Sequence, residues 1–140
     1  MNTLTRLPEM LFEIADRLKL KAPTEAGLAE LPPSELELLR LVTLFPGCGI
    51  SFLTDRTKMR QANASSTVRS LVQRGLVRKV PGDTDKRAVR LYATEQADRD
   101  LDALRQVWLG RLLAAFAAAG LAEPEQTRLL ADLEALLAAM

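Results

Sequence analysis

The chain has 140 residues, a length suited to one domain with a single hydrophobic core. Its 19 Lys and Arg nearly balance 18 Asp and Glu, and it contains one cysteine and no histidine. These counts exclude Ser-His-Asp and Cys-His catalytic arrangements, histidine-ligated metals and an internal disulfide. No glycine-rich phosphate-binding motif is present either. We therefore expect no enzymatic activity, no metal and no cofactor.

Charged residues and a proline interrupt every early apolar run, so no secretory signal is visible. The longest apolar or glycine run, Leu112 to Ala122, is too short to span a bilayer. We expect a cytoplasmic protein that does not enter a membrane.

The first predicted helix covers about residues 5–20. Its apolar residues recur at steps of three and four and form one stripe: Leu4, Leu7, Leu11, Ile14 and Leu18. Pro8 is tolerated only in a first turn, which places the helix start near Thr5. Residues 22–33 are rich in proline and read as a connector.

Two further helices are predicted before residue 60. Ser34-Glu-Leu-Glu37 matches a capping box that opens a helix over about 35–45. Leucines lie on more than one side of this helix, which indicates that it is largely buried. Pro46-Gly47 ends it, and Ser51 is a candidate N-cap for the next helix, with a turn near Met59 and Arg60.

A short helix is predicted in the stretch from Gln61 to Gly75. Ala64, Val68, Leu71 and Val72 recur at helical spacing and face a core. Small, polar and basic residues occupy the other side, and no acidic residue occurs between Gln61 and Gly75. Gly75 stands where a helix ends in a left-handed residue.

A β-hairpin follows, with strands over 76–80 and 88–93 around the turn-rich tip Pro81 to Asp85. A helix with a hydrogen-bonding face followed by a basic hairpin is what a winged helix-turn-helix requires. Such a helix fits the major groove, where base edges carry a distinct donor and acceptor code. The hairpin can place arginines along the DNA backbone or in the minor groove.

The charge distribution supports this interpretation. Ten basic residues lie between Arg56 and Arg90 against Asp83 and Asp85, a net charge of +8, whereas residues 1–55 carry −3 and residues 91–140 carry −4. A basic middle between two acidic ends is typical of a polyanion-binding surface. The alternative is an ordinary solvated surface, which does not explain why acids thin out in this segment.

The C-terminal third predicts two helices. Thr94 is a good N-cap, and the apolar residues that follow continue one stripe as far as Gly120. Pro124 starts a last amphipathic helix, whose apolar residues are Leu129, Leu130, Leu133, Leu136, Leu137 and Met140. These helices have spare apolar surface, which favours dimerisation; the alternative is an intramolecular bundle with the first helix.

Two motifs resemble the MarR (multiple antibiotic resistance regulator) family. Asp85-Lys-Arg-Ala-Val-Arg-Leu-Tyr-Ala-Thr94 is similar to the family's wing, and Leu71-Val-Gln-Arg-Gly-Leu-Val77 to the end of its recognition helix. Ala93 and Ala97 depart from the usual Leu and Gly. The resemblance covers nearly the whole chain. It implies a mainly α fold with a small β-hairpin wing, in one domain of residues 1–140, with the winged helix-turn-helix at about 34–94 and dimerisation helices at about 5–20 and 95–140.

The resemblance also implies a homodimeric transcriptional regulator, most often a repressor, that binds a pseudo-palindromic double-stranded DNA operator. A small aromatic ligand that releases DNA is common in the family. We expect DNA contacts from Arg60, Asn63, Ser65, Ser66, Arg69, Ser70, Gln73, Lys86, Arg87 and Arg90. Asp85 is expected to hold Arg87 or a neighbour in place through a charge-assisted bond.

Two alternatives stay open. A winged-helix module that binds another protein and no DNA would favour an acidic or apolar recognition face, unlike this one. Cys48 is a candidate redox sensor, but no positive charge adjacent in sequence would stabilise its thiolate, which favours a plain loop residue.

Overall fold

The computed structural model describes residues 3–20, 28, 30–84 and 88–140. In chain order the elements are a 3₁₀ turn η1 (Thr3–Arg6), α1 (Leu7–Arg17), α2 (Pro33–Leu44), α3 (Ile50–Thr57), α4 (Gln61–Gln73), β1 (Val77–Pro81), β2 (Val89–Ala93), α5 (Glu95–Ala119) and α6 (Glu123–Ala139). The predicted fold class, mainly helical with one antiparallel hairpin, is confirmed.

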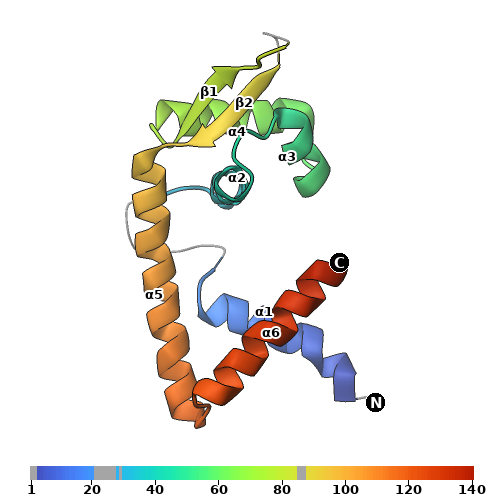
Figure 1. Ribbon diagram of the computed structural model, residues 1–140, viewed down its shortest axis with the longest axis vertical. Coiled ribbons are helices and arrows are strands. Elements are labelled where there is room, and N and C mark those ends of the chain that lie inside the picture. The colour runs from blue at the N-terminus through green and yellow to red at the C-terminus, as the bar shows by residue number, and fades with distance from the viewer. Residues whose placement is uncertain (1–2, 21–27, 29, 85–87) are drawn as a thin grey trace.

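The molecule has two parts joined by α5 (Figure 1). At one end, α2, α3, α4 and the β1–β2 hairpin form a lobe, hereafter the head. At the other end lie α1 and α6. The 25-residue α5 runs from the head to the start of α6, about 37 Å at 1.5 Å per residue.

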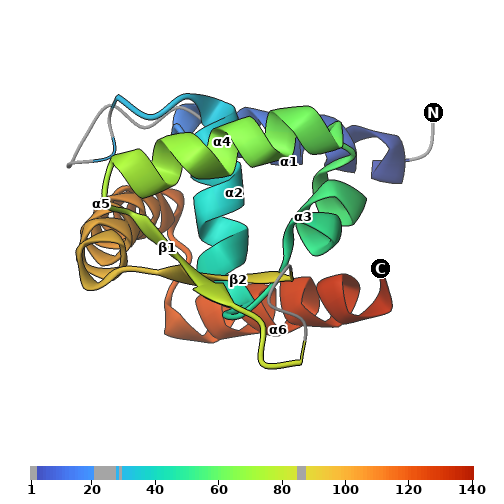
Figure 2. The ribbon, with the colours of Figure 1, turned by 90° about the horizontal axis from the view of Figure 1, so that it is seen from above.

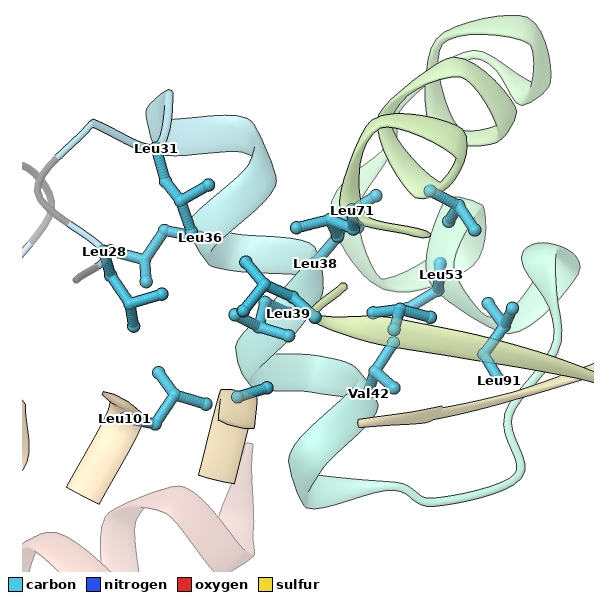
Figure 3. Packing of buried hydrophobic residues seen from close by; sticks show 14 of the residues in the cluster. Leu28, Leu31, Leu36, Leu38, Leu39, Val42, Leu53, Leu71, Leu91 and Leu101 are labelled. Carbon is cyan, nitrogen blue, oxygen red and sulfur yellow. The ribbon is translucent and has the colours of Figure 1, made fainter. Parts of the chain in front are cut away.

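The hydrophobic core belongs to the head (Figure 3). Central α2 contributes Leu36, Leu38, Leu39 and Val42, each no more than 2% exposed, which explains why its apolar residues lie on more than one side. The rest of the core comes from neighbouring elements: Leu28, Leu31, Leu53, Val68, Leu71, Leu76, Val77, Leu91, Ala97, Leu101 and Leu104. The first half of α5 packs against this core, with Trp108 partly buried at its far end.

Three predicted helix starts are wrong. The capping box at Ser34 does not form, because α2 begins at Pro33, with Pro32 as its N-cap. Proline is favoured at that position, since its φ is already helical and it has no N–H to be satisfied. Ser51 lies inside α3, whose N-cap is Gly49. The α-helix α1 begins at Leu7, two residues after the predicted start, because residues 3–6 form the 3₁₀ turn.

The predicted connections around α4 and the hairpin are confirmed. Gly75 adopts φ +75°, the left-handed conformation that a side chain disfavours, and so ends α4. Thr94 caps α5 by accepting a hydrogen bond from the Ala97 N–H at 3.2 Å. Its hydroxyl also donates to the Gly75 carbonyl at 2.7 Å, which ties the start of α5 to the end of α4.

Neither α1 nor α6 contains a buried residue. The two helices overlap in Figure 1 but are separate in Figure 2. Their large apolar side chains stay open to solvent; Met10 of α1 is 50% exposed and Leu137 of α6 is 74% exposed. The intramolecular bundle is therefore not formed within the described residues.

Among the described residues, no helix combines the length and apolar character needed to cross a membrane.

Candidate nucleic-acid interface

Helix α4 has one buried face and one exposed face. Ala64, Val68 and Leu71 are fully buried against the core, as their spacing predicted. On the other side Asn63, Ser66, Arg69 and Gln73 are exposed, and Ser65 is half-buried. Figure 2 shows α4 lying over α2 on the side of the molecule away from α1 and α6. The polar face of α4 is therefore free to approach a partner.

The N-terminus of α4 is suited to binding an anion. Lys58 closes α3 in the left-handed conformation, φ 61°, and lets the chain turn into α4. Arg60 is the N-cap, and no side chain caps the first turn. The free N–H groups of a first helical turn and its dipole attract phosphate, and the exposed Arg60 adds a full positive charge there.

Arg56 at the end of α3 is held by aromatic rings. Its guanidinium carbon lies 5.0 Å from the ring centre of Phe45 and 5.8 Å from that of Phe52. The two rings pack with centres 4.9 Å apart. Because Arg56 stays exposed, the stacking orders a cation that can still meet a phosphate.

The hairpin is anchored to the head through β2. Val77 pairs with Ala93, and the register continues to Pro81 opposite Val89. Leu91 is fully buried, accepts a hydrogen bond from the Gly47 N–H and donates one to the Cys48 carbonyl. The strand is thus pinned to the loop between α2 and α3, which fixes the hairpin beside α4.

The exposed side chains of the two strands are basic. Arg78, Lys79 and Arg90 are all open to solvent. Arg78 stacks on Tyr92 at 4.7 Å from the ring centre, and Tyr92 in turn lies against Gly47. The hairpin therefore presents ordered positive charge next to the polar face of α4.

The tip of the hairpin is described only in part. Asp85, Lys86 and Arg87 lie outside the described residues, so their predicted roles stay predictions. Asp83, which the sequence analysis did not single out, lies 3.8 Å from Arg90. Both side chains are well exposed, so this pair contributes little stability.

Ser70 differs from the other residues predicted for DNA contact. It is half-buried, and its Oγ donates to Glu35 Oε1 on α2 at 2.7 Å. Arg74 Nε lies 2.9 Å from the other oxygen, Glu35 Oε2. Ser70 is therefore engaged inside the head rather than turned outward with Asn63 and Arg69.

Sequence reasoning missed Glu35, having assigned its segment to a capping box. Glu35 is 8% exposed and is the one charged residue buried in the described part of the chain. A carboxylate on a helix that is otherwise largely buried is a usable signal, because a buried charge requires a partner. The identity of that partner was not readable from the sequence.

Cys48 shows no feature of a reactive thiol. It is half-buried, and its backbone pairs with Leu91. Burial raises the pKa of the Cys48 thiol, which keeps it protonated at neutral pH. The described residues also contain no cluster of carboxylate or cysteine side chains arranged for a metal.

A depression of about 360 Å³ lies between the end of α1 and the start of α2, with Leu20, Leu36 and Arg40 among its lining residues. Arg40 also stacks over Trp108 of α5, with its guanidinium carbon 5.8 Å from the ring centre. The buried Trp108 Nε1 has no hydrogen-bond partner among the described residues. A buried N–H without an acceptor can donate to a bound polar group.

Part of the chain matches a model of a known protein family. A family model described as "MarR family" matches residues 29–88, from the residues before α2 to the start of β2. A sequence comparison with curated proteins gives no match.

Solved structures with the same fold cover nearly the whole chain. A MarR-family transcriptional regulator from Silicibacter pomeroyi is 23% identical, with a TM-score of 0.69, over 96% of this chain and 89% of that one. FabT from Streptococcus pneumoniae, solved in complex with DNA, is 17% identical, with a TM-score of 0.67, over 95% and 94%. The regulator Tm0710 from Thermotoga maritima is 15% identical, with a TM-score of 0.73, over 97% and 94%.

Proposed function

Since residues 29–88 match the MarR family and the whole chain has the fold of MarR-type winged helix proteins, we propose that this protein is a transcriptional regulator that binds double-stranded DNA sequence-specifically as a homodimer. The observation that carries the proposal is the exposed, polar and basic face of α4 beside the basic strands of the hairpin. In this proposal residues 1–140 act as one MarR-type domain.

The contacts divide into two groups. Asn63, Ser66 and Arg69 of α4 read base edges in the major groove, with Ser65 and Gln73 at the edges of the same face. The exposed cations around α4 bind phosphates: Arg60 before the helix and Arg90 on the wing, with Lys86 and Arg87 at the predicted tip. Ser70 is left out of both groups, because its hydroxyl is bonded to Glu35.

The homodimer rests on the exposed apolar surface of the terminal helices. Large apolar side chains of the terminal region, from η1 and α1 and from the second half of α5 to the end of the chain, are 37–98% exposed: Leu4, Leu7, Met10, Leu11, Phe12, Ile14, Leu109, Leu113, Leu121, Leu129, Leu130, Leu133, Leu136, Leu137 and Met140. Exposed large apolar side chains in this number are typical of helices that pack against a partner chain. Pairing of two chains there places two α4 helices on one duplex, so the operator is a pseudo-palindrome with half-sites roughly 34–36 Å apart.

We further propose that a small ligand regulates DNA binding. The depression beside α2 is lined in part by Arg40, which offers a cation to an aromatic acid or phenol. It lies between the head and the terminal helices, where an occupant can change their relative position. We propose that the protein represses transcription and that binding of such a ligand relieves the repression.

The test is footprinting on DNA next to the protein's own gene, followed by titration of the protected duplex in increasing salt. We expect a protected pseudo-palindrome and an affinity that falls steeply with salt as counterions are released. Binding of equal strength to a scrambled duplex, or no DNA binding at all, would contradict the proposal. The second result would favour a winged-helix module that binds another protein.

A further inference from the structure

Helices α2 and α4 are joined by a small polar cluster at the C-terminal end of α4. Glu35 reaches from α2 and accepts a hydrogen bond from Ser70 at 2.7 Å, while Arg74 lies 2.9 Å from its second oxygen. Ser70 and Arg74 are four residues apart, so they lie on the same side of α4. Ser70 donates a hydrogen bond to Glu35 Oε1, and Arg74 forms an ion pair with Glu35 Oε2, which accepts no hydrogen bond within the described residues.

We propose that Glu35 is a positioning residue for α4: by holding Ser70 and Arg74 together, it fixes the orientation in which the polar face of α4 meets DNA. This inference rests on the proposed function. It concerns no direct DNA contact by Glu35, which faces the interior.

The two helices are held together by contacts of two kinds. Val68 and Leu71 hold α4 against the core, but apolar contacts are non-directional and tolerate small rotations and tilts. Hydrogen bonds to a carboxylate are directional and, because the acceptor is charged, stronger than neutral ones. Glu35 therefore adds the angular restraint that the apolar contacts lack.

The restraint affects base readout because the cluster lies at the C-terminal end of α4, far from Asn63. Ser70 follows Asn63 by seven residues, about 10 Å along a helix. A tilt of about 10° about the Ser70 end would move Asn63 by roughly 2 Å, which is more than the tolerance of a hydrogen bond. Base readout at the N-terminal part of α4 thus depends on an anchor at the other end.

The ion pair with Glu35 gives Arg74 a different role from that of Arg69. Both are basic residues of the same segment, and Arg69 is exposed on the outer face. The charge of Arg74 is matched by Glu35 at close range. Arg74 therefore neutralises a carboxylate rather than a DNA phosphate.

The principal test compares Glu35→Gln with Glu37→Gln, which removes the same charge from an exposed position of α2. In the full-length chain, the affinity for the footprinted operator is divided by the affinity for a scrambled duplex. Glu35→Gln places an amide donor toward Arg74 or Ser70, so we expect this ratio to fall by about tenfold or more, the effect of losing one charged hydrogen bond. Glu37→Gln leaves the ratio unchanged.

The possible results distinguish a failure of the positioning role of Glu35 from a failure of the proposed DNA-binding function. If Glu35 carried no positioning role, its removal would free Arg74 for phosphates and strengthen binding to both duplexes alike, leaving the ratio unchanged; that result overturns the inference. A wild type that does not prefer the operator would instead overturn the proposed function. Helical circular dichroism and sedimentation of each variant establish that the folded dimer is retained.

Ser70→Ala provides a milder variant in case Glu35→Gln fails to fold. It removes one donor and leaves the Glu35–Arg74 pair, so we expect a smaller fall in the same ratio. In the double variant the loss should equal that of Glu35→Gln alone, because Ser70 acts through Glu35. Additive losses would show that Ser70 touches DNA itself, and an unchanged ratio in Ser70→Ala would count against the cluster.

The salt dependence gives an independent readout. Arg74→Gln should lower the ratio and leave the salt slope of binding unchanged, whereas Arg60→Gln, at a residue that the proposal places on a phosphate, should reduce the slope by about 0.9. A slope reduced by Arg74→Gln would place Arg74 on the DNA and overturn its assignment.

Discussion

The head and the terminal helices differ in how they are stabilised. The core under the head contains ten fully buried large side chains, among them Leu28 and two leucines from the start of α5, and the helices and hairpin of the head pack against one another. In α1 and α6, by contrast, not one residue is buried. The contrast indicates that the head can hold its shape from its own contacts, whereas the terminal helices would be covered only in the proposed dimer. Variants in the two regions should therefore fail in different ways.

The largest effect is expected from Leu133→Asp in α6. A charge placed in the proposed dimer interface costs several kcal/mol, on the order of the whole stability margin of a small protein. The variant should be monomeric or unfolded by sedimentation, and its operator affinity should collapse although every DNA-facing residue is intact. Ala135→Asp, on the opposite side of α6 by helical periodicity, is the matched control and should stay dimeric. A folded Leu133→Asp monomer with wild-type affinity would refute the dimer.

Leu71→Ala in α4 should weaken the head itself. Leu71 is fully buried, and removing such a side chain costs about 2–5 kcal/mol of unfolding free energy through lost burial and the cavity left behind. The loss should be independent of protein concentration in denaturant titrations. The corresponding change at the interface, Leu133→Ala, should give a loss that grows on dilution, since dimers dissociate by mass action. If the loss of unfolding free energy depended on protein concentration in the same way for both variants, the head and the terminal helices would not differ in how they are stabilised.

Within the head, the helix and the wing should contribute differently. Asn63→Ala and Arg69→Ala should each cost about 1–3 kcal/mol at particular base pairs, because their side chains have directional donors and acceptors. Arg87→Ala should instead weaken binding to every sequence and lower the salt slope by about one phosphate. Titration of operator variants and a random duplex measures both effects. Equal losses on specific and random DNA for the helix variants would disprove base readout.

The smallest effect is expected at Cys48. Burial raises the pKa of its thiol above the ordinary value, so the reactive thiolate forms only as pH rises further into the alkaline range than for a free cysteine. Cys48→Ser should keep operator affinity, and peroxide should not release the wild type. Alkylation should be slower in the folded than in the unfolded chain at the same pH. Peroxide release that disappears in Cys48→Ser would instead identify an oxidant sensor.

Local chemistry made much of the head predictable. The spacing of Ala64, Val68 and Leu71 gave the buried face of α4, and Gly75 and Thr94 marked the boundaries around the hairpin. The start of α2 was misjudged because the capping-box pattern of Ser34 to Glu37 directly follows Pro33, which is itself favoured at the first helical position.

The Glu35–Ser70 contact was beyond sequence reasoning for a different reason. It joins residues 35 positions apart, and nothing in the periodicity of either helix specifies which polar side chains meet across their contact. The outward position of Asn63 and Arg69 followed from periodicity alone, whereas the inward turn of Ser70 required the packing of α2 on α4.

The central claim, two heads held at a fixed spacing by paired terminal helices, is tested most directly by changing the operator. Affinity is measured for the footprinted duplex and for the same duplex with about five base pairs inserted between its half-sites, half a helical turn. The account predicts that the insertion reduces affinity to that of a single half-site, because the second α4 then faces the wrong side of the duplex. Equal affinity for the two duplexes would contradict it.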